Sequence, residues 1–295
     1  MMDPGLGTGK IVDLPGGRVA YTERGAGPPV VFVHGLLVNA NLWRKVVPTV
    51  ADAGFRCLAP NLPLGAHRIP MPADADLTPP GVARLIAEFL DVLDLTDVTV
   101  VANDTGGALT QILMTNYPDR LGRVVLTPCD AFEEFFPEPF TSMPKRVGLP
   151  GAMWLLSRLL QLPAVQRQPT AYGWVAKRPI PAEIVRSYVR PSYESHQIRR
   201  DAKRFITGVH NKHTLAAARK LTGFTKPVLL VRAADDRVFP AVLFERLAAT
   251  LPDARLVTVD DSYAFVSEDQ PAELARLVVD FMANRGETEP AERPA

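Results

Sequence analysis

The alternation of strand-like and helix-like patterns limits this 295-residue chain to a narrow group of folds. Six β-branched, apolar runs have the continuous character of strands covered on both faces. They are PVVFVHG (29–35), RCLAPNL (56–62), DVTVVAND (97–104), RVVLTPCD (123–130), PVLLVRAADD (227–236) and ARLVTVDDS (254–262). Helical patterns lie between them, at 81–95 and 107–117, and after the last of them, at 271–283. We expect an α/β fold with a mostly parallel central sheet flanked by helices, and active groups at the carboxyl ends of the strands.

Two regions depart from this alternation. The chain opens with two alternating runs joined by Gly16 and Gly17, which predicts a β-hairpin. Residues 131–225 are helical, interrupted by prolines and rich in aromatic residues. We interpret them as a helical cap inserted into a core made of residues 1–130 and 226–285. The polar residues 286–295 are predicted to form a flexible tail.

The overall composition points to a small ligand. A net charge of +1 gives no sign of a nucleic-acid or membrane partner, so we expect a small apolar or weakly polar molecule. Cys57 and Cys129 are predicted to be buried thiols, and no segment reads as a signal peptide or membrane span, which together predict a cytoplasmic protein. No spacing indicates a metal or a cofactor, and a homodimer remains open.

The segment 100–108, Val-Val-Ala-Asn-Asp-Thr-Gly-Gly-Ala, is a strand that enters a helix through a turn of small residues. Asp104 in this turn is also a residue type that caps helices, so the segment alone has a purely structural interpretation. The segment nevertheless resembles the nucleophile elbow of α/β-hydrolases, with Asn103 before the nucleophile and Asp104 in its place. The resemblance implies that the backbone N–H groups of Thr105 and Leu36 form an oxyanion hole, with His34 as a structural part of that turn.

An aspartate nucleophile narrows the resemblance to the epoxide hydrolase and haloalkane dehalogenase branch. The branch implies attack of the carboxylate on a strained or halogen-bearing carbon, followed by hydrolysis of the resulting ester. The resemblance implies a supporting acid either at Asp236, four positions before a proline, or at Asp130. In epoxide hydrolases, cap tyrosines bind the departing oxygen. The cap aromatic residues that could line such a site are Tyr172, Trp174, Tyr188 and Tyr193.

Two residues depart from this branch. Thr105 replaces the tryptophan that usually follows the nucleophile, so a halide pocket that uses an indole N–H is in doubt. Ala264, in the sequence Ser-Tyr-Ala-Phe (262–265), replaces the histidine that activates water. His67, on the loop after the RCLAPNL run, is the candidate for a relocated base.

These observations leave three hypotheses open. The chain is a hydrolase that uses Asp104 on an epoxide or alkyl halide with an atypical base, or a hydrolase-like binding or sensing protein. In the third hypothesis Asp104 catalyses a lyase or isomerase reaction that needs no water.

Overall fold

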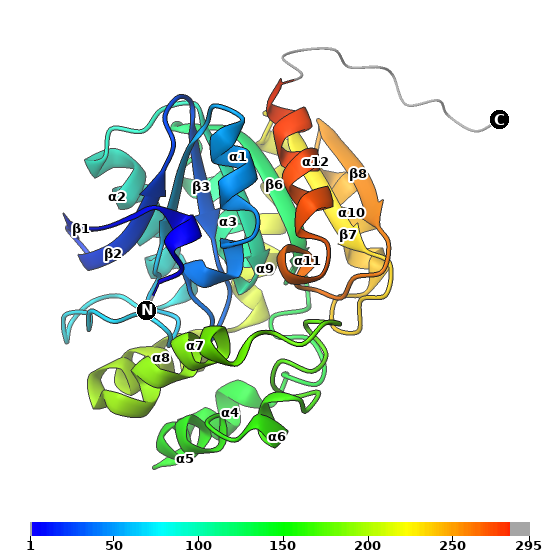
Figure 1. Cartoon of the computed structure of the whole chain (residues 1–295). Helices are drawn as coiled ribbons and strands as arrows, with labels where there is room; N and C mark the ends of the chain where they lie inside the picture. Colours follow the sequence, from blue (N-terminus) through cyan, green and yellow to red (C-terminus); the bar gives the residue numbers. More distant parts are fainter. Residues whose placement is uncertain (1, 284–295) are drawn as a thin grey trace.

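The computed structural model describes residues 2–283 and contains an eight-stranded sheet in the order β1-β2-β4-β3-β5-β6-β7-β8 (Figure 1). β1 and β2 pair antiparallel, β2 also pairs antiparallel with β4, and the remaining neighbours are parallel. The strands span Thr8–Leu14 (β1), Gly17–Arg24 (β2), Pro29–Val33 (β3), Arg56–Pro60 (β4), Val98–Asp104 (β5), Leu121–Cys129 (β6), Val228–Ala233 (β7) and Ala254–Val259 (β8). Every predicted strand is therefore present, and the predicted α/β-hydrolase architecture is confirmed.

The helices that cover the sheet are α1 (Val47–Asp52), α2 (Pro79–Val92), α3 (Thr105–Asn116), α10 (Ala241–Thr250), α11 (Val266–Asp269) and α12 (Pro271–Ala283). Of these, α2, α3 and α12 match the predicted helical patterns, and the other three were not predicted. α2 begins with Pro79, and Thr78 caps it by accepting a hydrogen bond from the Gly81 N–H. The hairpin is also present, with Leu14 paired to Gly17. Gly17 has a φ of 137°, a backbone conformation that favours glycine.

The region between β6 and β7 holds six further helices. They are α4 (Met143–Gly148), α5 (Ala152–Leu159), α6 (Pro163–Gln166), α7 (Ala182–Glu194), α8 (His196–Gly208) and α9 (Asn211–Ala218). In Figure 1, α4 to α8 lie together at one end of the molecule, below the sheet. α9 instead packs on α3, where Ala217 joins Ile112 and Ala83 in a small buried cluster. The last helix of the predicted cap segment therefore packs against a helix of the predicted core.

Short 3₁₀ turns complete the chain, at Pro4–Leu6, Ala40–Trp43 and Leu221–Gly223. Cys57 and Cys129 are buried and unpaired, as predicted. Within residues 2–283, no helix is both long and apolar enough to cross a membrane. The predicted flexible tail, 286–295, lies outside the described residues.

Candidate active site

The turn between β5 and α3 forces Asp104 into an unusual backbone conformation. Its φ of 56° and ψ of −135° are rarely adopted by residues other than glycine, and such strain often marks a functional residue. Small neighbours permit the turn. A Cβ on Gly106 would lie 2.6 Å from the carbonyl oxygen of His34, and a Cβ on Gly35 would lie 2.5 Å from the Cβ of Asp104. The backbone thus holds Asp104 at the carboxyl end of β5.

Two backbone N–H groups stabilise the carboxylate of Asp104. The N–H of Thr105 donates to Oδ1. The N–H of Leu36 is close enough to lower the pKa of the same carboxyl group. Burial raises the pKa of Asp104, and these hydrogen bonds oppose the rise because they stabilise the ionised form. Leu36 and Thr105 therefore converge on Asp104 from two different strand ends.

Asp130 provides a second carboxyl group beside Asp104. It follows β6, which pairs with β5 through Cys129 opposite Asp104. The hydroxyl of Thr105 donates to Asp130 Oδ2 at 3.2 Å, whereas Oδ1 is buried without a protein partner. Burial and the neighbouring Asp104 raise the pKa of Asp130 well above its usual value. Asp130 therefore favours its neutral form, which can donate a hydrogen bond from an apolar site.

Asp236 lies in the loop after β7, and its two oxygens differ. Oδ1 accepts from the N–H groups of Val238 at 2.8 Å and Phe239 at 3.0 Å, whereas Oδ2 is buried without a protein partner. Burial raises the pKa of Asp236 to about 6, and Asp104 adds to the shift. The adjacent Asp235 is more exposed and forms an ion pair with Lys177 at 2.6 Å. Of the two aspartates in this loop, Asp236 is the one that points inward.

Ala264 is fully buried in the turn before α11. The side-chain amide of Asn103 donates to the carbonyl oxygens of Ala264 at 2.9 Å and Pro128 at 3.0 Å. Asn103, the residue before Asp104, therefore holds the Ala264 turn and the end of β6 close to the nucleophile turn. Phe265, the next residue, lines the pocket described below.

The structure does not bring a histidine to Asp104. His67 is buried outside the pocket, where Nε2 lies 3.3 Å from Asp201 Oδ2 of α8 and Nδ1 accepts from the Gly65 N–H at 3.4 Å. His34 is also buried, and its Nε2 accepts from the Leu62 N–H at 2.9 Å. Burial lowers the pKa of His34 to about 4, so its ring is neutral. Neither ring is placed to activate water at Asp104, which removes the reason for choosing His67 as the base.

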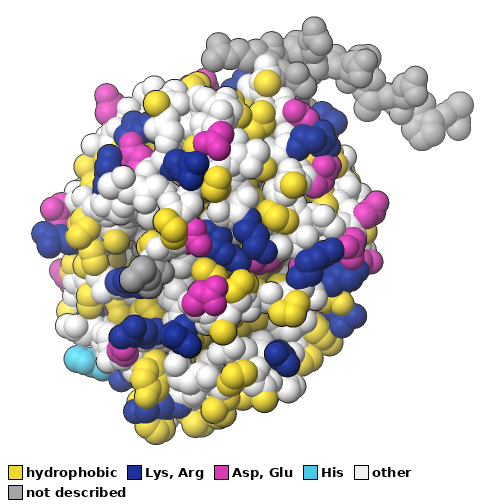
Figure 2. All heavy atoms as spheres, in the orientation of Figure 1, with side chains coloured by type: hydrophobic (Ala, Val, Ile, Leu, Met, Phe, Trp, Pro, Cys, Tyr) yellow, Lys and Arg dark blue, Asp and Glu magenta, His cyan; other side chains and the backbone are white. Residues whose placement is uncertain are grey.

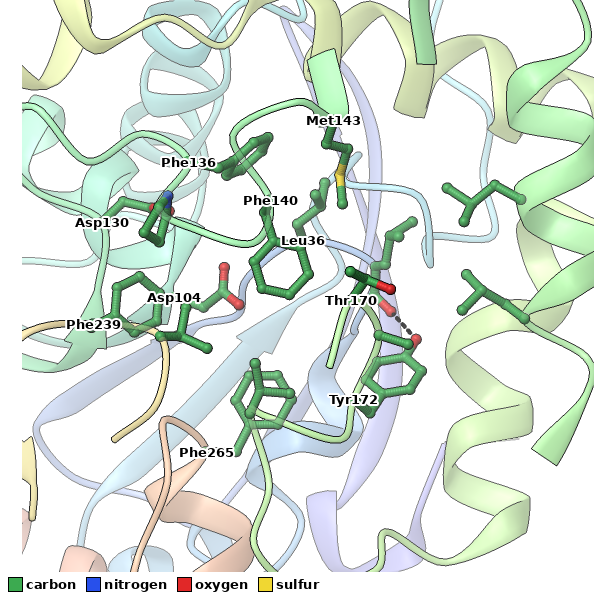
Figure 3. A pocket seen from close by; sticks show the side chains of 17 residues that line it. Leu36, Asp104, Asp130, Phe136, Phe140, Met143, Thr170, Tyr172, Phe239 and Phe265 are labelled. Atoms are coloured by element: carbon green, nitrogen blue, oxygen red, sulfur yellow. Dashed lines mark hydrogen bonds between the residues drawn. The ribbon is translucent and has the colours of Figure 1, made fainter. Parts of the chain in front are cut away.

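An apolar pocket lies between the sheet and the cap, with Asp104 and Asp130 in its wall (Figure 3). The lining residues are Leu36, Leu37, Asp104, Asp130, Phe136, Pro137, Phe140, Met143, Leu156, Leu160, Thr170, Ala171, Tyr172, Val175, Val238, Phe239 and Phe265. Most of the cap members were not predicted from the sequence. Their only sequence signal is apolar character within a proline-interrupted segment, which does not distinguish pocket residues from packing residues.

The cap aromatic residues occupy different positions. Tyr172 lines the pocket, and its hydroxyl donates to the carbonyl oxygen of Leu37 at 2.9 Å. Trp174 packs against the core but does not line the pocket. Tyr188 is buried away from the pocket, and the Tyr193 hydroxyl accepts from Arg158 at the surface. Only Tyr172 among these candidates therefore contributes to the pocket.

Comparison with known proteins identifies the fold family. The family model of the α/β-hydrolase fold matches residues 28–271. Haloalkane dehalogenase 2 of Mycobacterium tuberculosis is 30% identical over 281 residues, covering 91% of this chain and 92% of that protein. A cis-3-alkyl-4-alkyloxetan-2-one decarboxylase of Shewanella oneidensis is 26% identical over 283 residues, covering 90% of this chain and 86% of that protein.

A solved structure shows the same fold. The epoxide hydrolase CorEH superposes with a TM-score of 0.75 at 21% identity, covering 94% of this chain and 98% of that one. The chain belongs to the α/β-hydrolase fold family and is a hydrolase-type enzyme with haloalkane dehalogenases among its relatives.

Proposed function

We propose that the protein opens a small apolar epoxide, with Asp104 as the nucleophile. The observation that carries this proposal is the position of the Asp104 carboxylate, which accepts from the Thr105 N–H and faces the Leu36 backbone in the same pocket. In a serine hydrolase, such donors receive an oxygen of the substrate. Here they hold the carboxylate itself, so an ester formed on Asp104 would keep its carbonyl oxygen against them. The same donors would then stabilise the oxyanion when water attacks that ester.

The pocket favours an epoxide over an alkyl halide. No tryptophan is among the residues that line it, so no indole N–H is available there to bind a departing halide. Asp130, by contrast, lines the pocket and favours its neutral form. In the proposed step, an oxygen of Asp104 bonds to a ring carbon and the carbon–oxygen bond of the epoxide breaks. The released oxygen takes a proton from Asp130.

We assign water activation in the second step to Asp236, because Ala264 has no group that accepts a proton. Asp236 Oδ2 is buried and has no protein partner, so a bound water is the expected partner. A pKa of about 6 leaves the carboxylate largely ionised at neutral pH, as a base must be. Through one water or a short chain of waters, Asp236 removes a proton from the water that attacks the ester carbonyl of Asp104. The acyl–oxygen bond of the ester then breaks, and the departing oxygen takes the proton held by Asp236. The proton of the Asp104 carboxyl group that remains returns through water to Asp130, so the net reaction adds one water to the epoxide and gives a diol.

Incubation with a panel of apolar epoxides and haloalkanes, followed by intact-mass measurement, tests this proposal. We expect epoxides to give diol and a transient adduct, and Ala264→His to shorten the lifetime of that adduct. Haloalkanes are expected to react more slowly. If neither the natural chain nor Ala264→His forms an adduct or a product with any compound, the proposal is wrong.

One observation favours a second candidate, a lyase or isomerase reaction without water. Asp104 and Asp130 face one pocket, burial raises the pKa of both, and no histidine lines that pocket. Such a pair can move a proton between two substrate atoms. The similarity to an enzyme named as a decarboxylase supports this candidate. Turnover of a substrate without any adduct on Asp104 would favour it over ester chemistry, and saturable binding without turnover would favour a sensing role.

A further inference from the structure

The net charge of +1 conceals a strong separation of charge along the chain. Residues 131–225 contain 15 lysines and arginines and 6 aspartates and glutamates, which gives the cap segment a charge of +9. The rest of the chain contains 18 basic and 26 acidic residues, a charge of −8. The separation is sharpest at 139–182, where six basic residues occur and no acidic residue does. The cap segment is therefore cationic relative to the rest of the chain.

Exposed apolar side chains gather in the same segment. Of the nine exposed large apolar residues in the described part of the chain, five lie between positions 149 and 162. They are Leu149, Trp154, Leu155, Leu159 and Leu162, with 41–62% of each exposed. Exposed basic side chains lie among them or next to them in sequence, namely Lys145, Arg146, Arg158 and Arg167. We call these nine residues the cap surface. Figure 2 shows dark blue and yellow side chains side by side over the lower part of the molecule, where Figure 1 places α4, α5 and α6.

The helix α5 is apolar on both sides. Leu156, on its inner side, lines the pocket, and so does Leu160 just beyond its end. Leu155 and Leu159 are one turn apart on its exposed side. Six of the eight residues of α5 are apolar, the exceptions being Ser157 and Arg158, and apolar residues on the exposed side of a helix are normally covered by protein or lipid. The exposed half of α5 therefore lacks the apolar environment that its sequence suits.

Trp154 adds a second feature of lipid interfaces. It is half exposed, and the guanidinium of Arg158 lies 5.1 Å from the centre of its ring. Tryptophan beside arginine, with leucines on the adjoining face, is the composition of helices that lie in the headgroup region of a membrane.

We propose that the cap surface binds the surface of a membrane rich in anionic lipid. Apolar side chains enter the headgroup boundary, and the surrounding lysines and arginines pair with lipid phosphates. A second copy of this chain is a poorer occupant, because a two-fold contact through this surface brings like charges together. The overall charge gave no reason to expect a membrane partner, whereas the distribution of charge over the fold does.

Vesicle co-sedimentation of the full chain tests the proposal. We expect binding to vesicles of phosphatidylcholine and phosphatidylglycerol in equal parts, loss of binding at high salt, and little binding to phosphatidylcholine alone. Lys145→Ala with Arg146→Ala should weaken binding by roughly fivefold for each residue. Leu155→Glu with Leu159→Glu should abolish it. The matched control is Val242→Glu on α10, where the side chain is exposed to the same 52% as Leu155 but lies outside the cap surface.

Three results would overturn the proposal. The first is a protein that stays in the supernatant with anionic vesicles, and the second is binding that Val242→Glu reduces as much as the leucine pair does. The third is a dimer, measured by light scattering without lipid, that Leu155→Glu with Leu159→Glu converts to a monomer. That last result would assign the surface to a second copy of the chain.

Discussion

The nucleophile turn after β5 and the turn that carries Ala264 differ in the groups that they offer to a reaction. At Asp104, backbone N–H groups and closely packed glycines position the reacting group. Around Ala264, the corresponding side chain is reduced to a methyl group, and nearby polar atoms lack protein partners, including Asp236 Oδ2 and Asn103 Oδ1. Asp130 Oδ1, beside Asp104, is also buried without a protein partner, so the two regions differ chiefly in that only the first keeps its reacting side chain. The difference suggests that ester formation tolerates little change and that ester hydrolysis is the slower, more adaptable step.

The largest expected effect on the reaction is that of Asp104→Asn, which removes the nucleophile of the first turn. An amide is a poor nucleophile, so we expect adduct formation to fall by about 10³-fold or more. Asp235→Asn, at a partly exposed aspartate in an ion pair with Lys177, is the matched control and should retain the wild-type rate. Intact-mass time courses with an epoxide measure both. An adduct that forms equally well on the Asp104→Asn variant would show that Asp104 is not the nucleophile.

A smaller effect is expected from Asp236→Asn, which tests the proposed base in the loop after β7, near the Ala264 turn. The variant keeps an oxygen that can accept the N–H groups of Val238 and Phe239 but loses the base. We expect ester hydrolysis to slow by about 10²-fold, with ester formation nearly unchanged, so that the adduct accumulates. In the wild-type protein, the hydrolysis rate should fall as pH drops through about 6, the pKa of Asp236.

The charged and titratable neighbours of Asp236 bear on that pH profile. Asp104 faces it from the pocket, and the adjoining polar groove contains Lys177, Asp235, Arg237 and Tyr263. If the acid limb of the profile persists in Asp236→Asn, one of these groups or Asp130 controls the step, and the assignment of Asp236 is wrong.

Gly106→Ala tests the tight packing of the first turn. The new methyl group would meet the carbonyl oxygens of Val33 and His34 at 2.6–2.7 Å. We expect the free energy of unfolding to fall by about 1–3 kcal/mol. Gly223→Ala, where a Cβ meets nothing within 4 Å, is the control and should change stability little. Urea denaturation measures both, and equal losses would show that the turn is not specially constrained.

The smallest expected effect is on the Tm, because ionisation of the buried Asp236 destabilises the folded state. Folding raises the pKa of Asp236 from 3.8 to about 6, so the folded state favours the protonated form. Stability from this group is present at low pH and is lost as pH rises through that interval. Asp236→Asn cannot ionise, so its Tm should exceed the wild-type Tm by a few degrees at about pH 8 and match it at about pH 4. A lower Tm at both pH values would contradict this account.

The sequence predicted the core well because its signals are local. Continuous apolar runs identify the strands of the parallel sheet, and the small residues around Asp104 identify the strained turn. The spacing to Pro240 pointed to Asp236 over Asp235, and the structure places Asp236 inward and Asp235 in a surface ion pair. These features depend on residues that are close in sequence.

Features that depend on distant residues could not be predicted in this way. His67 lay on a plausible loop, but its partner Asp201 is 134 residues away in α8. Tyr172 and Trp174 are two residues apart, and only the packing of the cap decides that Tyr172 lines the pocket. The cap surface could not be predicted from the net charge, because that sum combines a basic cap segment with an acidic remainder of the chain.

Isotope labelling tests the central claim, an ester on Asp104, most directly. A single turnover of an epoxide by excess enzyme would be run in water enriched in ¹⁸O, followed by mass spectrometry of the product and of the peptide that contains Asp104. We predict that the diol carries only light oxygen, because its new oxygen comes from Asp104, and that the Asp104 carboxylate gains one heavy oxygen. Heavy oxygen in the diol with an unlabelled Asp104 would mean that water attacks the epoxide directly, and the ester mechanism would be wrong.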